Sequence, residues 1–140
     1  MTNVAFIGAG RMALAHADAL SRLPNVRIGA VFDPVPAVAA AFATRFPGVA
    51  VRASQADIAA DPGIDGVLVC NYTDQHHQSV VGLLQAGKRR IFCEKALVRH
   101  LADGEDLLVR VQAAEALVMV GHHRRHMPGY AKLRALVAEG

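Results

Sequence analysis

Hydrophobic and polar positions alternate in blocks along the whole chain. Short apolar runs, many of them rich in β-branched residues, are separated by longer segments in which Ala and Leu recur at helical spacing. The short runs predict six strands, which are Val4–Ile7, Val26–Phe32, Val49–Arg52, Val67–Cys70, Ile91–Cys93 and Leu117–Val120. Because this alternation is typical of a parallel sheet linked by crossover helices, we expect the α/β class.

The segments between the strands predict the helices, and proline and glycine mark several of their ends. The predicted helices are Arg11 to about Leu23, Ala37–Phe46, a short helix from the cap Ser54 to Ala60, a helix capped by Asp74 that runs to Gln85, Ala102–Ala114, and a last amphipathic segment Tyr130–Ala138. Six strands with right-handed crossovers predict a doubly wound Rossmann sheet in the order 3-2-1-4-5-6. Helices on both faces then give three α/β/α layers.

A glycine-rich turn follows the first strand directly. The segment Gly8-Ala9-Gly10-Arg11-Met12-Ala13 fits the pattern G-x-G-x-x-A and opens the first helix. Gly8 permits the tight turn, Gly10 lets the backbone approach a pyrophosphate, and Ala13 permits close packing of helix and strand. The helix start offers N–H groups to phosphates, and Arg11 either adds a charge there or points to solvent. A strand-to-helix turn alone also favours glycine, so this motif needs a second signal.

Asp33 supplies that signal at the end of the second strand, 23 residues beyond Gly10. An acid at this place accepts hydrogen bonds from the hydroxyls of the adenosine ribose. The same carboxylate repels a 2′-phosphate, so NAD is favoured over NADP. The competing interpretation is a helix cap before Pro34.

Composition narrows the class of protein further. The chain has 140 residues, 53% hydrophobic and 19% charged, which suits one globular domain, and it lacks an apolar run near the roughly 20 residues that span a bilayer. The start of the chain lacks the features of a secretory signal, so we expect a cytoplasmic protein. Cys70 and Cys93 end apolar runs and are expected to be reduced core residues.

The segment His122–His126 comes closest to a basic patch, in a chain whose formal charge is only +3. Since no aromatic residue is interleaved with it, nucleic acid is not favoured as a partner. It also lacks a carboxylate at ligand spacing, so we favour a polar strand end over a metal site. His16 and His77 lie on otherwise apolar helices and are expected to be packed, hydrogen-bonded residues rather than ligands.

The fifth strand ends in Cys93-Glu94-Lys95-Ala96, which places a charged pair at the edge of the sheet where a nicotinamide would lie. From spacing alone, a solvated loop pair is the favoured interpretation. Five motifs, this one included, occur in one order along nearly the whole chain. They are Gly8-Ala9-Gly10-Arg11-Met12-Ala13 with His16, Asp61-Pro62-Gly63-Ile64-Asp65-Gly66-Val67, Ala86-Gly87-Lys88, Cys93-Glu94-Lys95 and Gly121-His122-His123-Arg124-Arg125-His126-Met127-Pro128. Together they resemble the Gfo/Idh/MocA family, the glucose-fructose oxidoreductase and inositol dehydrogenase family.

The resemblance implies roles for individual residues. Lys95 matches the family's substrate-binding lysine, which assists proton transfer while a hydride moves. It implies that Glu94 contacts the nicotinamide ribose region and that His123 approaches the nicotinamide from the sixth strand. Three residues after the fourth strand, Asn71, Tyr72 and His76, would border the cofactor, with Gly8, Gly10, Arg11, Met12 and Asp33 completing the site.

Some positions depart from the family pattern. Ala96 stands where the family has proline, Asn71-Tyr72 stands where Thr-Pro is common, and one extra residue lies between Lys88 and Cys93. These departures bear on the geometry around Lys95.

The resemblance implies a dehydrogenase that transfers hydride between a nicotinamide and a sugar, inositol or related polyol. Residues 1–121 would form the Rossmann domain, and residues 122–140 a connecting segment and helix leading to a second α/β substrate domain. We expect the family chain to continue past Gly140, and residues 1–140 alone to bind nucleotide with little turnover. The alternative is a stand-alone NAD-sensing regulatory module, which would have no use for Glu94-Lys95. The sequence leaves the substrate and any homo-oligomer open.

Overall fold

A single six-stranded parallel sheet organises the chain, which a computed structural model describes over residues 1–140. Its strand order is β3-β2-β1-β4-β5-β6, which confirms the predicted Rossmann order. The strands are β1 (Thr2–Ile7), β2 (Val26–Phe32), β3 (Ala50–Val51), β4 (Gly66–Val69), β5 (Arg90–Cys93) and β6 (Leu117–Val120). The order reverses between β1 and β4, so the carboxyl ends of these two strands flank the place where a doubly wound sheet binds its ligands.

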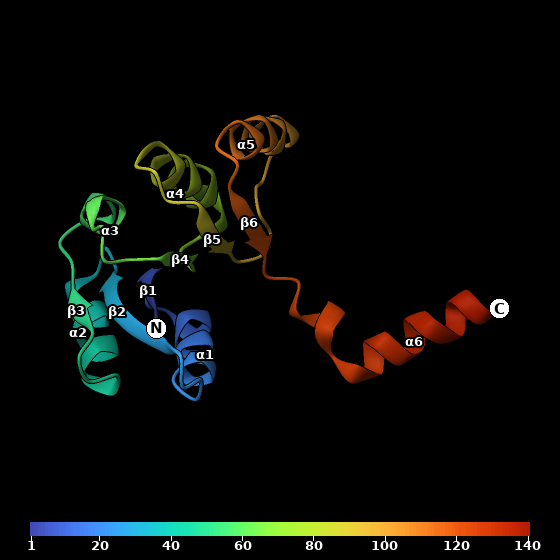
Figure 1. The fold of residues 1–140 in the computed structure, drawn as a ribbon, viewed down its shortest axis with the longest axis horizontal. Coiled ribbons are helices and arrows are strands. Elements are labelled where there is room, and N and C mark those ends of the chain that lie inside the picture. The colour runs from blue at the N-terminus through green and yellow to red at the C-terminus, as the bar shows by residue number, and fades with distance from the viewer.

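Helices cover both faces of the sheet, as Figure 1 shows. The helices α1 (Arg11–Leu20) and α2 (Pro36–Arg45) lie on one face. The opposite face carries α3 (Gln55–Ala60), α4 (Thr73–Gln85) and α5 (Leu101–Ala113). The predicted three-layer α/β/α architecture is confirmed.

Each face of the sheet has its own hydrophobic core. Phe6 packs with Ala13 and Ala17 of α1 and with Phe42 of α2 on the first face. The second core joins the sheet to residues such as Ile58 of α3, Leu83 of α4 and Leu107 of α5. The almost wholly apolar β4 is buried at all four positions, as a central strand covered on both faces requires.

Several predicted boundaries were wrong in instructive ways. The first helix ends at Leu20 rather than near Leu23, and the third strand is only Ala50–Val51. Asp74 does not cap its helix, because the cap position is Tyr72 and Asp74 lies in the first turn. By contrast, the predicted Ser54 cap is confirmed: Ser54 Oγ accepts from Asp57 N, and Asp57 Oδ2 accepts from Ser54 N.

Residues 122–140 project away from the body as an arm, visible in Figure 1. The 3₁₀ helix η1 (His123–His126) replaces the predicted polar strand end, and α6 (Pro128–Glu139) follows it. Every residue from His122 to Gly140 is exposed. None of the helices is both long enough and apolar enough to cross a membrane.

Candidate functional site: a dinucleotide cleft at the strand ends

The glycine-rich turn joins β1 to α1 in the conformation that its sequence predicts. Gly8 has a φ of +91°, and a Cβ there would lie 2.6 Å from Asn71 N, so only glycine fits between the ends of β1 and β4. Gly10 is different, because a Cβ there would meet nothing within 4 Å. Gly10 therefore borders open space in front of α1.

The amino end of α1 is free of side-chain caps. Gly10 occupies the cap position without a capping hydrogen bond, and no acid lies in the first turn. The exposed Arg11 and the half-buried Met12 are its first two residues. Unpaired N–H groups at such a helix start, reached over a glycine with no Cβ in the way, suit a phosphate.

Asp33 connects the second strand to this turn. Its Oδ2 accepts from Ala9 N at 2.9 Å, and its Oδ1 accepts from Val35 N at 2.9 Å. Each oxygen keeps a lone pair for a further donor, and the side chain is half-buried. The helix-cap interpretation of Asp33 is wrong, because α2 begins at Pro36 with Val35 at its cap position and no side-chain capping hydrogen bond. The carboxylate instead binds the backbone of Ala9 and Val35.

Residues after β4 form the next wall. Tyr72 is 79% exposed, whereas His76 is fully buried, with Nε2 lying 3.1 Å from Asn71 O and Nδ1 lying 2.8 Å from Ala96 O. A neutral imidazole carries one N–H and donates to one of these carbonyls at a time. His76 therefore ties the loop after β4 to the loop after β5. Asn71 Oδ1 is buried without a hydrogen-bond partner.

Glu94 and Lys95 follow β5, and their side chains differ sharply. Glu94 is 5% exposed, whereas Lys95 is exposed. Glu94 Oε1 lies 2.6 Å from His16 Nε2, and its Oε2 accepts from Lys95 N at 3.1 Å. The peptide bond between Lys95 and Ala96 is cis. The buried carboxylate thus binds the backbone of Lys95, whose side chain is exposed.

His16 is a residue whose place in this site sequence reasoning missed. Its ring packs edge-on against Phe92, with centroids 4.9 Å apart, while Nε2 reaches Glu94. It is hydrogen-bonded and packed, as expected, but its partner lies 78 positions away. Its inclusion in the glycine-rich motif was the only available signal.

His123 lies in η1 and lines the same cavity as Lys95. The site residues therefore come from the ends of β1, β2, β4 and β5 and from η1.

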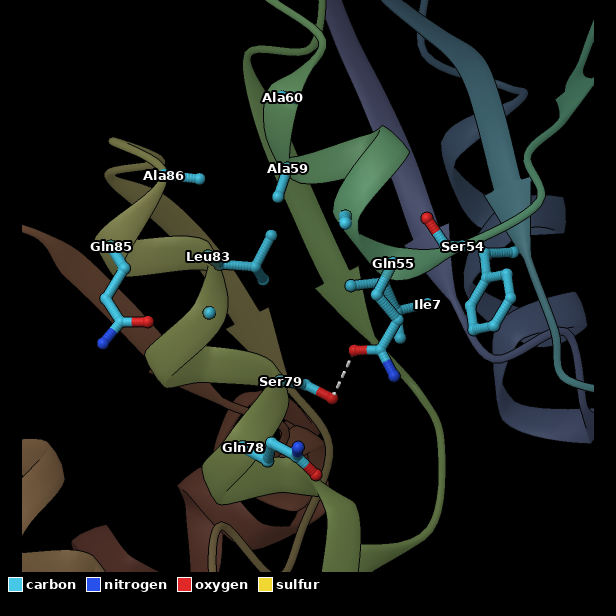
Figure 2. Close-up of a pocket in the computed structure, with 13 residues that line it drawn as sticks. Ile7, Ser54, Gln55, Ala59, Ala60, Gln78, Ser79, Leu83, Gln85 and Ala86 are labelled. Atoms are coloured by element: carbon cyan, nitrogen blue, oxygen red, sulfur yellow. Dashed lines mark hydrogen bonds between the residues drawn. The ribbon is translucent and has the colours of Figure 1, made fainter.

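A second cavity, of about 710 Å³, lies between α3 and α4 and was not foreseen (Figure 2). Ser79 Oγ donates to Gln55 Oε1 across it at 2.8 Å, and Phe32, next to Asp33, forms part of its wall. It holds no ionisable side chain.

The two cysteines are free and lie against the same strand ends. Burial, followed by the nearby Glu94 carboxylate, raises the pKa of both Cys70 and Cys93 to about 12. Such thiols stay protonated and unreactive at neutral pH. Their expected role as reduced packing residues fits this environment.

A parallel sheet with this order, an uncapped helix start behind glycines and an acid at the end of β2 defines a dinucleotide-binding Rossmann domain. The model of the oxidoreductase family with an NAD-binding Rossmann fold, GFO_IDH_MocA, matches residues 2–122. The chain belongs to this family.

Relatives of this chain include dehydrogenases and reductases. Inositol 2-dehydrogenase of Rhizobium meliloti is 37% identical over 134 residues, which are 96% of this chain and 40% of that protein. The structure of GenD2 from gentamicin A biosynthesis, in complex with NAD, has a TM-score of 0.92 at 26% identity and covers 98% of this chain and 39% of that one.

Biliverdin reductase of Synechocystis sp. PCC 6803, in complex with biliverdin and NADP⁺, has a TM-score of 0.80 at 27% identity over 86% of this chain and 38% of that one. The chain therefore spans about 40% of the length of the curated relatives it matches. Of these two solved structures, one holds NAD and the other NADP⁺, so the comparison supports a nicotinamide cofactor and does not choose between its two forms.

Proposed function

We propose that this chain binds NAD in preference to NADP, as the cofactor domain of a dehydrogenase acting on a polyol or sugar-like hydroxy compound. The observation that carries the proposal is the hydrogen bond from Ala9 N to Asp33, which unites the phosphate-binding turn with a ribose-binding acid. The pyrophosphate would lie over Gly8 and Gly10 at the start of α1, beside Arg11 and Met12.

Asp33 supports the preference for NAD. A carboxylate with one lone pair free on each oxygen accepts hydrogen bonds from two ribose hydroxyls, and it repels a 2′-phosphate. The adenine would enter the cavity between α3 and α4, because Phe32 beside Asp33 forms part of its wall. That uncharged cavity suits a neutral aromatic ring.

The remaining site residues would border the nicotinamide half. Asn71 and Tyr72 would lie along it, and the unpaired Asn71 Oδ1 offers an acceptor to the carboxamide or ribose. His76 would act by fixing the backbone of both flanking loops. Glu94 would define the floor of the ribose pocket, and His123 would approach from η1.

Lys95 is the proposed catalytic residue. When bound, a nicotinamide would supply the acceptor for the hydride that leaves the carbon carrying the substrate hydroxyl. The Lys95 amine would take the hydroxyl proton as the carbonyl forms, and would return it in the reverse reaction. Its side chain is exposed, and its backbone N–H is held by a hydrogen bond to the buried Glu94 carboxylate. Residues 122–140 are proposed as the segment that connects this domain to substrate-binding elements.

The role of Asp33 is tested by calorimetric titration with NADH and with NADPH. We expect the parent chain to prefer NADH by at least tenfold. Asp33→Ala should weaken NADH binding by at least tenfold and remove the preference, because no carboxylate then meets the ribose. Asp33→Asn keeps one acceptor oxygen for the backbone and serves as the structural control. Equal affinity for both cofactors, unchanged by either substitution, would contradict the assignment.

A further inference from the structure

A chain of hydrogen-bonded polar side chains runs from the loop after β4 to the cavity between α3 and α4. Asn71 Nδ2 donates to Ser79 Oγ at 2.9 Å, and Ser79 Oγ donates to Gln55 Oε1 at 2.8 Å. Figure 2 shows the second of these bonds, through which α4 and α3 face each other. Ser79 and Gln55 line the cavity, whereas Asn71 does not. Gln55 is therefore the end of the chain that a ligand in the cavity can meet.

The first two members of this chain of bonds are held by the structure around them. Asn71 O lies 3.1 Å from Nε2 of the buried His76. Asn71 N packs so closely against the glycine-rich turn that a Cβ on Gly8 would lie 2.6 Å from it. Ser79 is only 4% exposed, so its hydroxyl is shielded from water. The donor and the hydroxyl that precede Gln55 are therefore fixed in place.

The single hydrogen of the Ser79 hydroxyl sets the direction of these bonds. Because Ser79 Oγ accepts the N–H of Asn71, its own O–H is left to donate to Gln55 Oε1. A flipped Gln55 amide would point its N–H groups at that hydroxyl hydrogen. The Gln55 amide is therefore held with its oxygen toward Ser79 and its NH₂ group turned away.

Gln55 keeps hydrogen-bonding capacity for a ligand. The bond from Ser79 is the one hydrogen bond that its side chain makes, and Nε2 is not an enclosed atom. Two N–H donors and the second lone pair of Oε1 are therefore free. The cavity also contains Gln78 and Gln85, but both are exposed and their amides make no hydrogen bond that would fix them. Gln55 thus presents the one oriented amide in the cavity.

We propose that Gln55 selects adenine as the base of the dinucleotide, and that Ser79 and Asn71 are positioning residues that orient its amide. This inference rests on the proposed function, which puts the adenine in this cavity. An amide pairs with adenine by accepting from the 6-amino group and donating to the ring nitrogen beside it. Hypoxanthine has a carbonyl oxygen in place of the amino group, so two acceptors would face each other. The oriented amide therefore discriminates against a hypoxanthine dinucleotide.

Calorimetric titration with NADH and with reduced nicotinamide hypoxanthine dinucleotide tests the selection, because the two compounds differ only in the base. We expect the parent chain to bind NADH about tenfold more tightly or better, the usual discrimination of an amide that pairs with one base. Gln55→Ala should reduce this ratio to below about threefold by weakening NADH binding. Gln85→Ala removes an amide from the same cavity and is the control, which should leave the ratio within about twofold of the parent value.

Ser79→Ala separates the orientation of the amide from its presence. The freed Gln55 amide can turn its N–H toward the hypoxanthine carbonyl, so the hypoxanthine dinucleotide should bind about threefold more tightly or better, while NADH affinity stays within about threefold. Such a gain of binding cannot come from damage to the fold. An unchanged ratio in Ser79→Ala would overturn the positioning role.

The same titrations distinguish failure of this inference from failure of the proposed function. If the parent chain binds both dinucleotides with equal affinity, or prefers the hypoxanthine form, adenine selection by Gln55 is overturned and the dinucleotide site stands. An unchanged ratio in Gln55→Ala has the same meaning. If the parent chain binds neither compound, the proposed function fails, and the selection of a base fails with it.

Discussion

The two ends of the cleft present different kinds of chemical groups. At the β1–β2 end, the turn between Gly8 and Gly10 presents backbone groups, and one carboxylate, Asp33, hydrogen-bonds to that backbone. At the β5–β6 end, charged side chains dominate, with Glu94 buried against His16 and with Lys95 exposed. The first end depends on the space left by its glycines, which have no side chain. The second end depends on charged side chains, of which Glu94 is held by contacts with His16 and with the backbone of Lys95.

This difference matches the two tasks of the proposed site, which are to bind the cofactor and to transfer a proton. A pyrophosphate is bound by fixed N–H groups that need no titration, which suits a part of the site that must not change during turnover. A proton-transfer group has to be reachable by substrate while the backbone beneath it stays fixed. We therefore expect substitutions at the first end to change cofactor affinity or folding, and substitutions at the second to change turnover and substrate choice.

Replacing Lys95 tests the chemical end most strongly. Lys95→Ala should lower turnover by about 10²–10⁴-fold, the usual contribution of a positioned acid or base, while NADH affinity changes by less than threefold. The measurement compares kcat with the dissociation constant of NADH in the complete protein. Lys132→Ala, an exposed lysine of α6, is the control and should change neither value. Intact turnover in Lys95→Ala would contradict the catalytic role of Lys95 and therefore the proposed difference between the two ends of the cleft.

The two glycines test the cofactor end. Gly8→Ala should lower the free energy of unfolding by about 3 kcal/mol, since the new Cβ meets the backbone after β4 at a positive φ. Gly10→Ala has open space and should leave stability within about 0.5 kcal/mol while weakening NADH binding tenfold or more. Denaturant unfolding and NADH titration measure the two effects. Equal stability of the two variants would contradict the different structural roles of Gly8 and Gly10.

Removing His16 tests the buried pair. His16→Ala leaves Glu94 buried with one donor fewer and should cost about 2 kcal/mol of unfolding free energy. His77→Ala is the matched comparison, because His77 pairs with Asp106 at 2.7 Å on a more exposed surface, and its loss should cost less than about 1 kcal/mol. Chemical denaturation of both variants makes the comparison. A smaller loss in His16→Ala than in His77→Ala would contradict the anchoring role of the buried pair.

The smallest expected effect is on acid stability. Hydrogen bonds from Arg110 and then from His77 lower the pKa of Asp106 below its usual 3.8. A lowered folded-state pKa contributes stability above the unfolded value, and this contribution is lost as the pH falls through the folded value. Asp106→Asn should therefore be less stable than the parent at pH 6, with the gap closing below about pH 4. Glu105→Gln on the same helix is the control and should show no such closing gap in thermal unfolding.

Local sequence signals predicted most of the fold and the first end of the cleft. The six strands, the Ser54 cap and the glycine turn each depend on residues close together in the chain. The strand order joins distant residues and was predicted from the connection rules of doubly wound sheets. The second end could not be derived in this way, because His16 meets Glu94 across 78 positions and Arg124 meets Tyr130 only once α6 has formed. The Asp74 cap was wrong because the helix starts at Thr73, two residues earlier than an Asp74 cap requires, and Tyr72 takes the cap position.

The central claim is that residues 1–140 form one nicotinamide dinucleotide site, and titration of NADH fluorescence tests it most directly. We predict saturable binding of one NADH per chain, with enhanced or quenched nicotinamide emission at saturation and with affinity lowered at least tenfold in Gly10→Ala. An emission that rises linearly with NADH, as in buffer, at protein concentrations up to the millimolar range would contradict the claim.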